Sequence, residues 1–151
     1  AAVTPLFMAC QEGQVECVRL LLGANAAVDQ AKICGTAPLY IACQNGHLDV
    51  ARLLVNAHAA VNKANVNGVT PLFIACQEGH LECARLLLEA GAAVDQAKER
   101  GATPLFVACW KGQLECVRLL QNNHLEIARL LLEAGAAVDQ AKERGATPLF
   151  V

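Results

Sequence analysis

Four prolines recur at equal intervals along the chain: Pro5, Pro38, Pro71 and Pro104. The residues around them recur as well, because each proline lies in a T/A-P-L-F/Y phrase that is followed by Ala-Cys, a glycine and a leucine-rich run. A strict period of roughly 30 residues predicts a stacked array of small units, in which no unit buries its apolar face alone. Such an array favours binding over catalysis.

Each unit has the pattern of two helices and a connector, and residues 70–102 show it most clearly. Thr70-Pro71 has the form of an N-cap followed by the first helical residue, and Gly79 ends that helix. A second helix begins near Leu81, with apolar residues every three or four positions. It ends at a position that tolerates left-handed backbone, since glycine, asparagine and histidine alternate there. The residues at this position are Asn25, His58, Gly91 and Gly135.

The chain resembles the ankyrin repeat family in three segments of this unit. They are Gly68-Val69-Thr70-Pro71-Leu72, Gly79-His80-Leu81-Glu82 and Gly91-Ala92-Ala93-Val94-Asp95. The resemblance covers essentially the whole chain and implies an all-α solenoid of stacked helix-turn-helix units with short hairpin-like connectors. We expect a single ankyrin-repeat domain over residues 1–151. Its units are 4–36, 37–69, 70–102, an irregular 103–146 and a partial 147–151.

Two positions depart from the family pattern. Aromatic residues replace the family's histidine after T-P-L, and lysine or asparagine replaces the aspartate at the start of the connector. We therefore expect aromatic packing to substitute for the usual hydrogen bonds between repeats. The aromatic residues are Phe7, Tyr40, Phe73, Phe106 and Phe150, and the connector residues are Lys32, Asn65, Lys98 and Lys142.

The period breaks in the fourth unit, because Pro148 lies eleven positions later than the regular interval after Pro104 predicts. The offset can be explained by an insertion of eleven residues into one repeat. It can also be explained by two full repeats that have together lost two thirds of a repeat. Eleven residues make almost three helical turns, so one long helix over residues 113–133 would keep its apolar stripe in phase. A bend at Asn122-Asn123 is the alternative, and we favour it because asparagine favours turns and a helix ending at Leu120 has normal length.

The chain contains eight cysteines, of which seven follow the repeat in two registers. Val50 and Ile127 replace cysteine in the second register, as expected for a small buried hydrophobic position. Residues of one register in neighbouring helices lie about 8–10 Å apart, too far for a disulfide. We predict buried thiols, with Cys34 as the exposed and reactive exception, and an intracellular, cytoplasmic location unless the chain is engineered. The registers are Cys10, Cys43, Cys76 and Cys109, and Cys17, Cys83 and Cys116.

Composition excludes several classes of partner. A formal net charge of −2 gives no strong attraction to nucleic acid or to an anionic membrane. Charged residues interrupt every leucine run, so no membrane span is expected. The start at Ala1 predicts that the natural beginning of the chain is missing.

We expect no enzyme activity and no cofactor or metal. His47, His80 and His124 occupy the structural G-H-L position of the repeat, without a nucleophile or a carboxylate cluster beside them. The glycines fall at repeat boundaries and do not form a phosphate-binding loop.

The resemblance implies a scaffold that binds a protein partner through its concave face. Trp110 is the leading candidate, because Gln11, Gln44 and Gln77 occupy its position in the other units. In the other interpretation, the Trp110 side chain packs over the irregular junction and has no role in binding. The candidate residues are Ile33, Gln44, Asn45, Val66, Asn67, Gln77, Glu78, Glu99, Arg100, Trp110 and Lys111.

Two alternatives remain open. The identical segments Ala84–Val107 and Ala128–Val151 and the repeated A-K-E-R-G-A-T connector favour an engineered or consensus-like scaffold without a natural partner. Neither end carries the polar capping unit of such arrays, which favours self-association as a homodimer, by end-to-end stacking or by exchange of elements.

Overall fold

The computed structural model describes residues 3–98 and 101–133, without the side chains of 129–133. Contacts between Cα atoms divide the chain into two compact units, Ala1–Leu119 and Leu120–Val151. The single domain expected over residues 1–151 stays a prediction. Phe150, Lys142 and Gly135, expected to continue the repeat pattern, lie outside the described residues.

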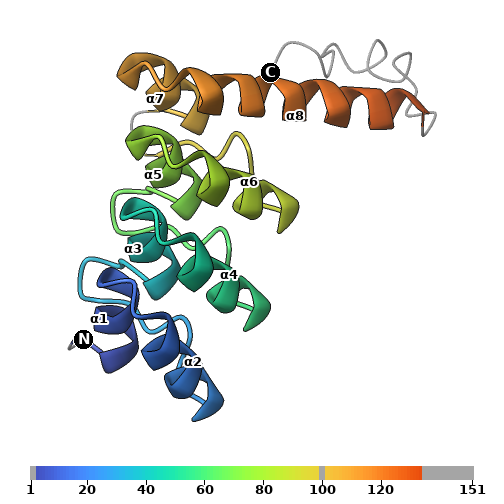
Figure 1. The fold of residues 1–151 in the computed structure, drawn as a ribbon. Coiled ribbons are helices and arrows are strands. Elements are labelled where there is room, and N and C mark those ends of the chain that lie inside the picture. Colours follow the sequence, from blue (N-terminus) through green and yellow to red (C-terminus); the bar gives the residue numbers. More distant parts are fainter. Residues whose placement is uncertain (1–2, 99–100, 134–151) are drawn as a thin grey trace, which may run out of the picture. The chain divides into compact units, whose positions relative to one another are not determined.

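Within Ala1–Leu119 the helices stack in pairs, as Figure 1 shows. The first helices pack in series, α1 on α3, α3 on α5 and α5 on α7, and the second helices α2, α4 and α6 pack in a parallel layer. This arrangement confirms the all-α class and the stacked helix-turn-helix units. The helices of the described residues are α1 (Pro5–Gln11), α2 (Val15–Gly23), α3 (Pro38–Gln44), α4 (Leu48–Asn56), α5 (Pro71–Glu78), α6 (Leu81–Glu89), α7 (Pro104–Lys111) and α8 (Leu114–Glu133).

The helix ends follow the predicted capping chemistry. Thr70 is the N-cap of α5, and its Oγ1 accepts a hydrogen bond of 3.1 Å from the amide of Phe73. Thr4 and Thr103 cap α1 and α7 in the same way. After the second helices, Asn25 and His58 adopt φ angles of 59° and 60°, which confirms the left-handed position.

Short hydrogen bonds join each repeat to the next. The imidazole Nε2 of His47 donates to the carbonyl oxygen of Gln11 at 3.0 Å, and Nε2 of His80 donates to that of Gln44 at 3.1 Å. Gln113 takes this position in the fourth repeat. The prediction for His124 was therefore wrong: it lies within α8, because the irregular junction moves it out of the G-H-L position.

The irregular junction forms one continuous helix. α8 runs from Leu114 to Glu133, so the bend favoured at Asn122-Asn123 was wrong. Eleven residues rotate the helix by just over three full turns, which keeps the apolar positions on one stripe. Leu114 and Leu125, eleven residues apart, are both exposed, as expected for positions in phase. The small helix propensity penalty of two asparagines does not overcome this continuity.

Candidate functional site

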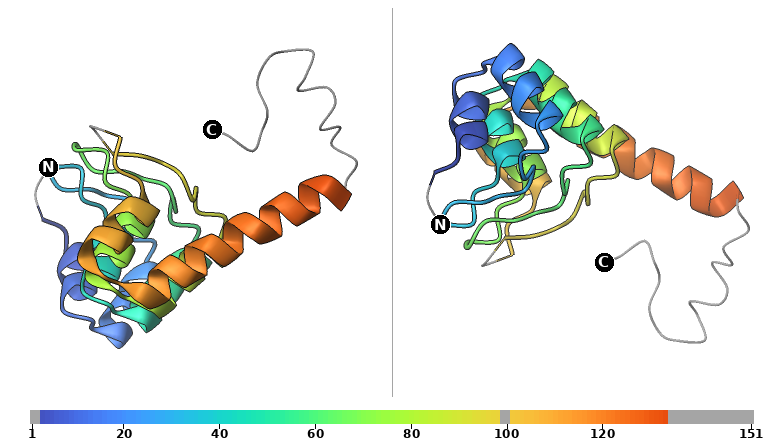
Figure 2. Two further views of the ribbon diagram at one scale, coloured as in Figure 1. Left: turned by 90° about the horizontal axis from the view of Figure 1, so that it is seen from above. Right: turned by 90° about the horizontal axis from the view of Figure 1, so that it is seen from below.

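The connectors and the first helices carry most of the predicted site residues. Figure 2 shows the connectors running side by side along one side of the first helices. Each closes as a hairpin, for example through a hydrogen bond from the amide of Lys32 to the carbonyl of Thr36. The amide of Val66 donates to the carbonyl oxygen of Cys34 at 3.1 Å, which joins the first connector to the second. The structure thus brings two connector tips together, with Ile33, Val66 and Asn67 exposed on them.

The polar candidates at the ends of α3 and α5 are held by hydrogen bonds. Asn45 Nδ2 donates to the carbonyl oxygen of Gln11 at 2.8 Å, and Gln77 Nε2 donates to Glu78 Oε1 at 2.7 Å. Gln44 is half-buried, and its carbonyl accepts the bond from His80. The side chains of Asn45, Gln77 and Glu78 are therefore oriented before any partner binds, whereas the bond at Gln44 involves its backbone only. Glu99 and Arg100 lie outside the described residues.

Trp110 lines a groove between α5 and α7. Its side chain is 75% exposed, and the ammonium of Lys111 lies 5.6 Å from its ring centroid. The groove encloses a cavity of about 290 Å³. Of the predicted site residues, the cavity brings together Gln77 and Trp110. Its lining is Phe73, Gln77, Lys98, Gly101, Ala102, Phe106, Val107 and Trp110.

Phe106 contributes an aromatic wall that the sequence analysis did not assign to the site. Phe7 and Phe73, at the same repeat position, are each 1% exposed, whereas Phe106 is 59% exposed. Lys32 covers Phe7, with its ammonium 4.0 Å from the ring centroid, and Lys98 lies 5.2 Å from that of Phe73. These lysines add ring contacts at the connectors, but hydrogen bonds between repeats persist beside them, so the expected substitution of aromatic packing for those bonds was wrong.

The exposure of Phe106 follows from the irregular junction. Lys32 and Lys98 follow Phe7 and Phe73 at one common spacing, and the position at that spacing after Phe106 lies within α8. Helix therefore occupies the part of the sequence that forms the covering connector in the other repeats. Counting the same spacing forward from Phe106 reaches Leu131 in place of a lysine, which is a signal in the sequence that this repeat differs from the others.

A family model described as ankyrin repeats, in three copies, matches residues 2–65 and 57–123. The chain belongs to the ankyrin repeat family. No curated protein matches it. The match identifies this ankyrin repeat protein by family alone, so an engineered origin and an intracellular location stay predictions.

The cysteines of this ankyrin repeat protein are buried or exposed according to their position in the stack of repeats. Five cysteines are buried and Cys34 is exposed, as predicted, but Cys17 and Cys109 are exposed too. For these two the core prediction was wrong, because among the described residues no further repeat packs on the outer sides of α2 and α7. Burial raises the pKa of Cys10 to about 12. The buried cysteines are Cys10, Cys43, Cys76, Cys83 and Cys116.

Two pairs of buried thiols meet between neighbouring repeats. The thiol of Cys43 hydrogen-bonds that of Cys83, and Cys76 bonds Cys116 in the same way. The bond raises the pKa of the first cysteine of each pair, which donates, and lowers the pKa of the second. Each contact joins the two cysteine registers, whereas the distance of about 8–10 Å expected from helix packing applies to cysteines of one register.

Cys34 is expected to react faster with a disulfide reagent than the other exposed cysteines, Cys17 and Cys109. The hydroxyl of Thr36, 3.0 Å from Cys34 Sγ, lowers the pKa of this thiol. At a pH below the pKa, a lower pKa leaves a larger thiolate fraction, and the thiolate is the nucleophile. Thr36→Val should slow labelling of Cys34 about two- to tenfold at neutral pH. Mass spectrometry of peptides from a labelling time course measures this; unchanged rates in the variant would contradict it.

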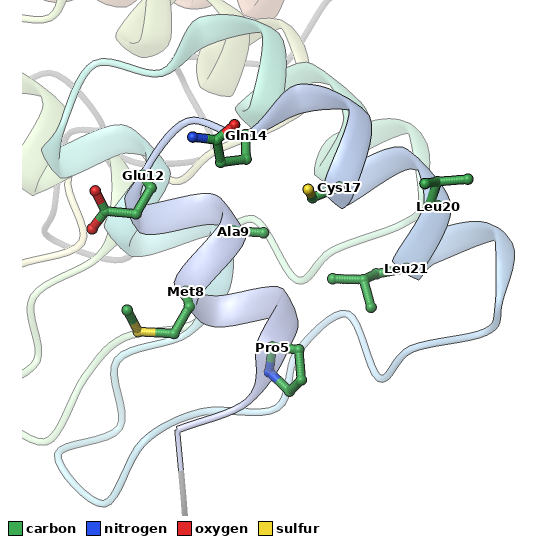
Figure 3. Close-up of a pocket in the computed structure, with 8 residues that line it drawn as sticks. All are labelled: Pro5, Met8, Ala9, Glu12, Gln14, Cys17, Leu20 and Leu21. Carbon is green, nitrogen blue, oxygen red and sulfur yellow. The ribbon is translucent and has the colours of Figure 1, made fainter.

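A second cavity lies on the outer side of α1 and α2. Its volume is about 620 Å³, and it is mainly apolar, with Met8, Cys17 and Leu20 on its walls (Figure 3). Met8 and Leu20 are 44% and 72% exposed, while Ile74 and Leu86 at the same positions of the third repeat are 3% and 9% exposed. The cavity therefore lies on the face of α1 and α2 that corresponds to a surface buried by a neighbouring repeat in the third repeat.

Two searches concern the part of the chain that the structure describes. No group of three histidine, cysteine, aspartate or glutamate residues there could hold a metal ion. No helix among the same residues is long and apolar enough to cross a membrane.

Proposed function

We propose that this ankyrin repeat protein is a non-catalytic module that binds a protein partner through its concave face, formed by the connectors and the first helices. Ankyrin repeats are generally protein–protein interaction modules, and the match to them supports this class of function. The observation that carries the proposal is the groove with Trp110, where a large aromatic side chain is exposed beside a cavity.

The groove has the features of a binding hot spot. Phe106 and Trp110 are four residues apart on α7, so their side chains share one face of the helix. Both are exposed and line one cavity, which gives a partner apolar surface to bury. Tryptophan is enriched among residues that dominate binding energy. The rigid helices on both sides hold this surface in place before binding.

Trp110→Gln is expected to weaken partner binding by about 2 kcal/mol or more, which is about 30-fold. Glutamine occupies this position in the other three repeats, so the variant keeps the fold. Leu20→Gln is the matched control, because Leu20 is equally exposed but lies on α2. Selection from a displayed library of random peptides, followed by affinity measurement, gives the readout. Equal binding by wild type and Trp110→Gln would reject the proposed face.

Self-association is a second candidate function, and the apolar cavity on α1 and α2 favours it. A second copy could bury Met8 and Leu20 as the third repeat buries Ile74 and Leu86. We expect light scattering after size-exclusion chromatography to show a mass that rises with protein concentration. Leu20→Glu should lower that mass to the monomer value. A monomer mass at both low and high concentration of the wild-type protein would contradict this candidate.

A further inference from the structure

We propose that the groove at Trp110 binds an acidic peptide segment that carries one large apolar side chain. The apolar side chain enters the cavity beside Phe106 and Trp110, and carboxylates of the segment bind Lys98 and Lys111. This inference rests on the proposed binding function and adds to it the chemistry of the partner.

The apolar anchor follows from the walls of the cavity. Phe106 and Trp110 supply exposed aromatic walls, and the buried side chains of Phe73 and Val107 also line the cavity. The exposed parts of Phe106 and Trp110 remain in contact with water until a ligand covers them. An apolar side chain of the partner removes this surface from water, and an aromatic side chain adds ring packing.

The acidic character follows from the charges around the cavity. Lys98 lines it, and Lys111 lies beside Trp110. Neither ammonium forms an ion pair with any residue of the described segments. Both lie over aromatic rings, at 5.2 Å and 5.6 Å from the centroids, which limits the positions of the ammonium groups.

The fourth repeat differs in charge from its neighbours at this place. Glu12 and Glu78 occupy the position of Lys111 in the first and third repeats, and Asn45 occupies it in the second. The carboxylate of Glu78 accepts a hydrogen bond from Gln77 Nε2 at 2.7 Å. The change to lysine therefore adds a cation at the repeat where, among the described residues, the aromatic side chain after T/A-P-L is exposed. A basic segment would meet two like charges there, which disfavours it.

The test selects peptides from one displayed random library against three forms of the full chain. These are the wild type, Trp110→Gln, and a double variant with Lys98→Glu and Lys111→Glu. All three substituted positions are solvent-accessible, so the fold is expected to persist, and circular dichroism of each form checks this. Sequencing then compares the peptides that each form enriches.

We expect the wild type to enrich peptides with aspartate or glutamate close to a leucine or an aromatic residue. The double variant should enrich basic residues at the same places, and Trp110→Gln should lose both pools. For one synthetic peptide from the wild-type pool, replacing its acidic residues by their amides should weaken binding about three- to tenfold, with the difference shrinking at high salt.

The contrary outcomes separate the inference from the function on which it rests. Trp110-dependent peptides without acidic residues would overturn the acidic partner and leave the binding face intact. No Trp110-dependent enrichment would overturn both. A synthetic peptide of residues 134–151 that displaces the selected peptide with equal affinity would also overturn the inference. In that case the occupant would be a segment of this chain whose two acidic and two basic residues give no net charge, and not an acidic partner.

Discussion

Phe73→Ala is expected to lower the free energy of unfolding by about 3–5 kcal/mol. Phe73 is 1% exposed at the centre of the stack, where α5 packs against both α3 and α7. Truncation removes apolar surface from the core and leaves a cavity that rigid neighbouring helices close only in part. The loss also removes the ring beneath the ammonium of Lys98.

Phe106→Ala is the matched control for this prediction. Both phenylalanines follow the same Thr-Pro-Leu phrase with a threonine N-cap, yet Phe106 is 59% exposed. We expect Phe106→Ala to cost less than about 1 kcal/mol, since an exposed side chain already contacts water. Urea unfolding followed by circular dichroism measures both variants. Equal costs would show that Phe106 is buried in solution and would remove the aromatic wall from the proposed groove.

Gly35→Ala is expected to destabilise the array by about 2–5 kcal/mol. Its φ of +77° costs an L-residue about 1–2 kcal/mol. A Cβ atom would also lie 2.9 Å from the amide nitrogen of Val66 in the next connector. The backbone must shift to relieve this overlap, at a further cost of about 1–3 kcal/mol. That shift weakens the hydrogen bond from Val66 to the carbonyl of Cys34.

Gly101→Ala separates the two parts of this cost. Gly101 occupies the same position of a later connector with a φ of +78°, but a Cβ atom there would meet nothing within 4 Å. We expect it to cost about 1–2 kcal/mol, the backbone part alone. Thermal unfolding of both variants gives the comparison. A Gly101→Ala cost as large as that of Gly35→Ala would mean that contact between connectors contributes nothing.

Helix positions and caps could be predicted because they depend on local chemistry. A threonine followed by proline favours the start of a helix, because the threonine caps it and proline fits its first position. Asn25 and His58 adopt the left-handed conformation at the ends of the second helices, where glycine stands in other repeats. The surface positions of Trp110 and Lys111 followed from the same register, since equivalent residues of a repeat occupy equivalent places.

The remaining features depend on which residues meet between repeats. The thiol contact of Cys43 with Cys83 joins two registers, and a period within one register carries no information on it. The exposure of Phe106 depends on a covering connector that helix replaces at that point in the sequence. The continuity of α8 depends on whether helical phase outweighs the turn preference of two asparagines, and the sequence supports both outcomes.

The hydrogen bonds between repeats have a kinetic consequence. Those that involve side chains join residues 31 to 36 positions apart in the sequence, the distance to the adjacent repeat. Forming them requires closing only short loops, and folding rates rise as contacts become more local in sequence. Each repeat can therefore dock on its predecessor soon after it leaves the ribosome, before the rest of the chain has been synthesised.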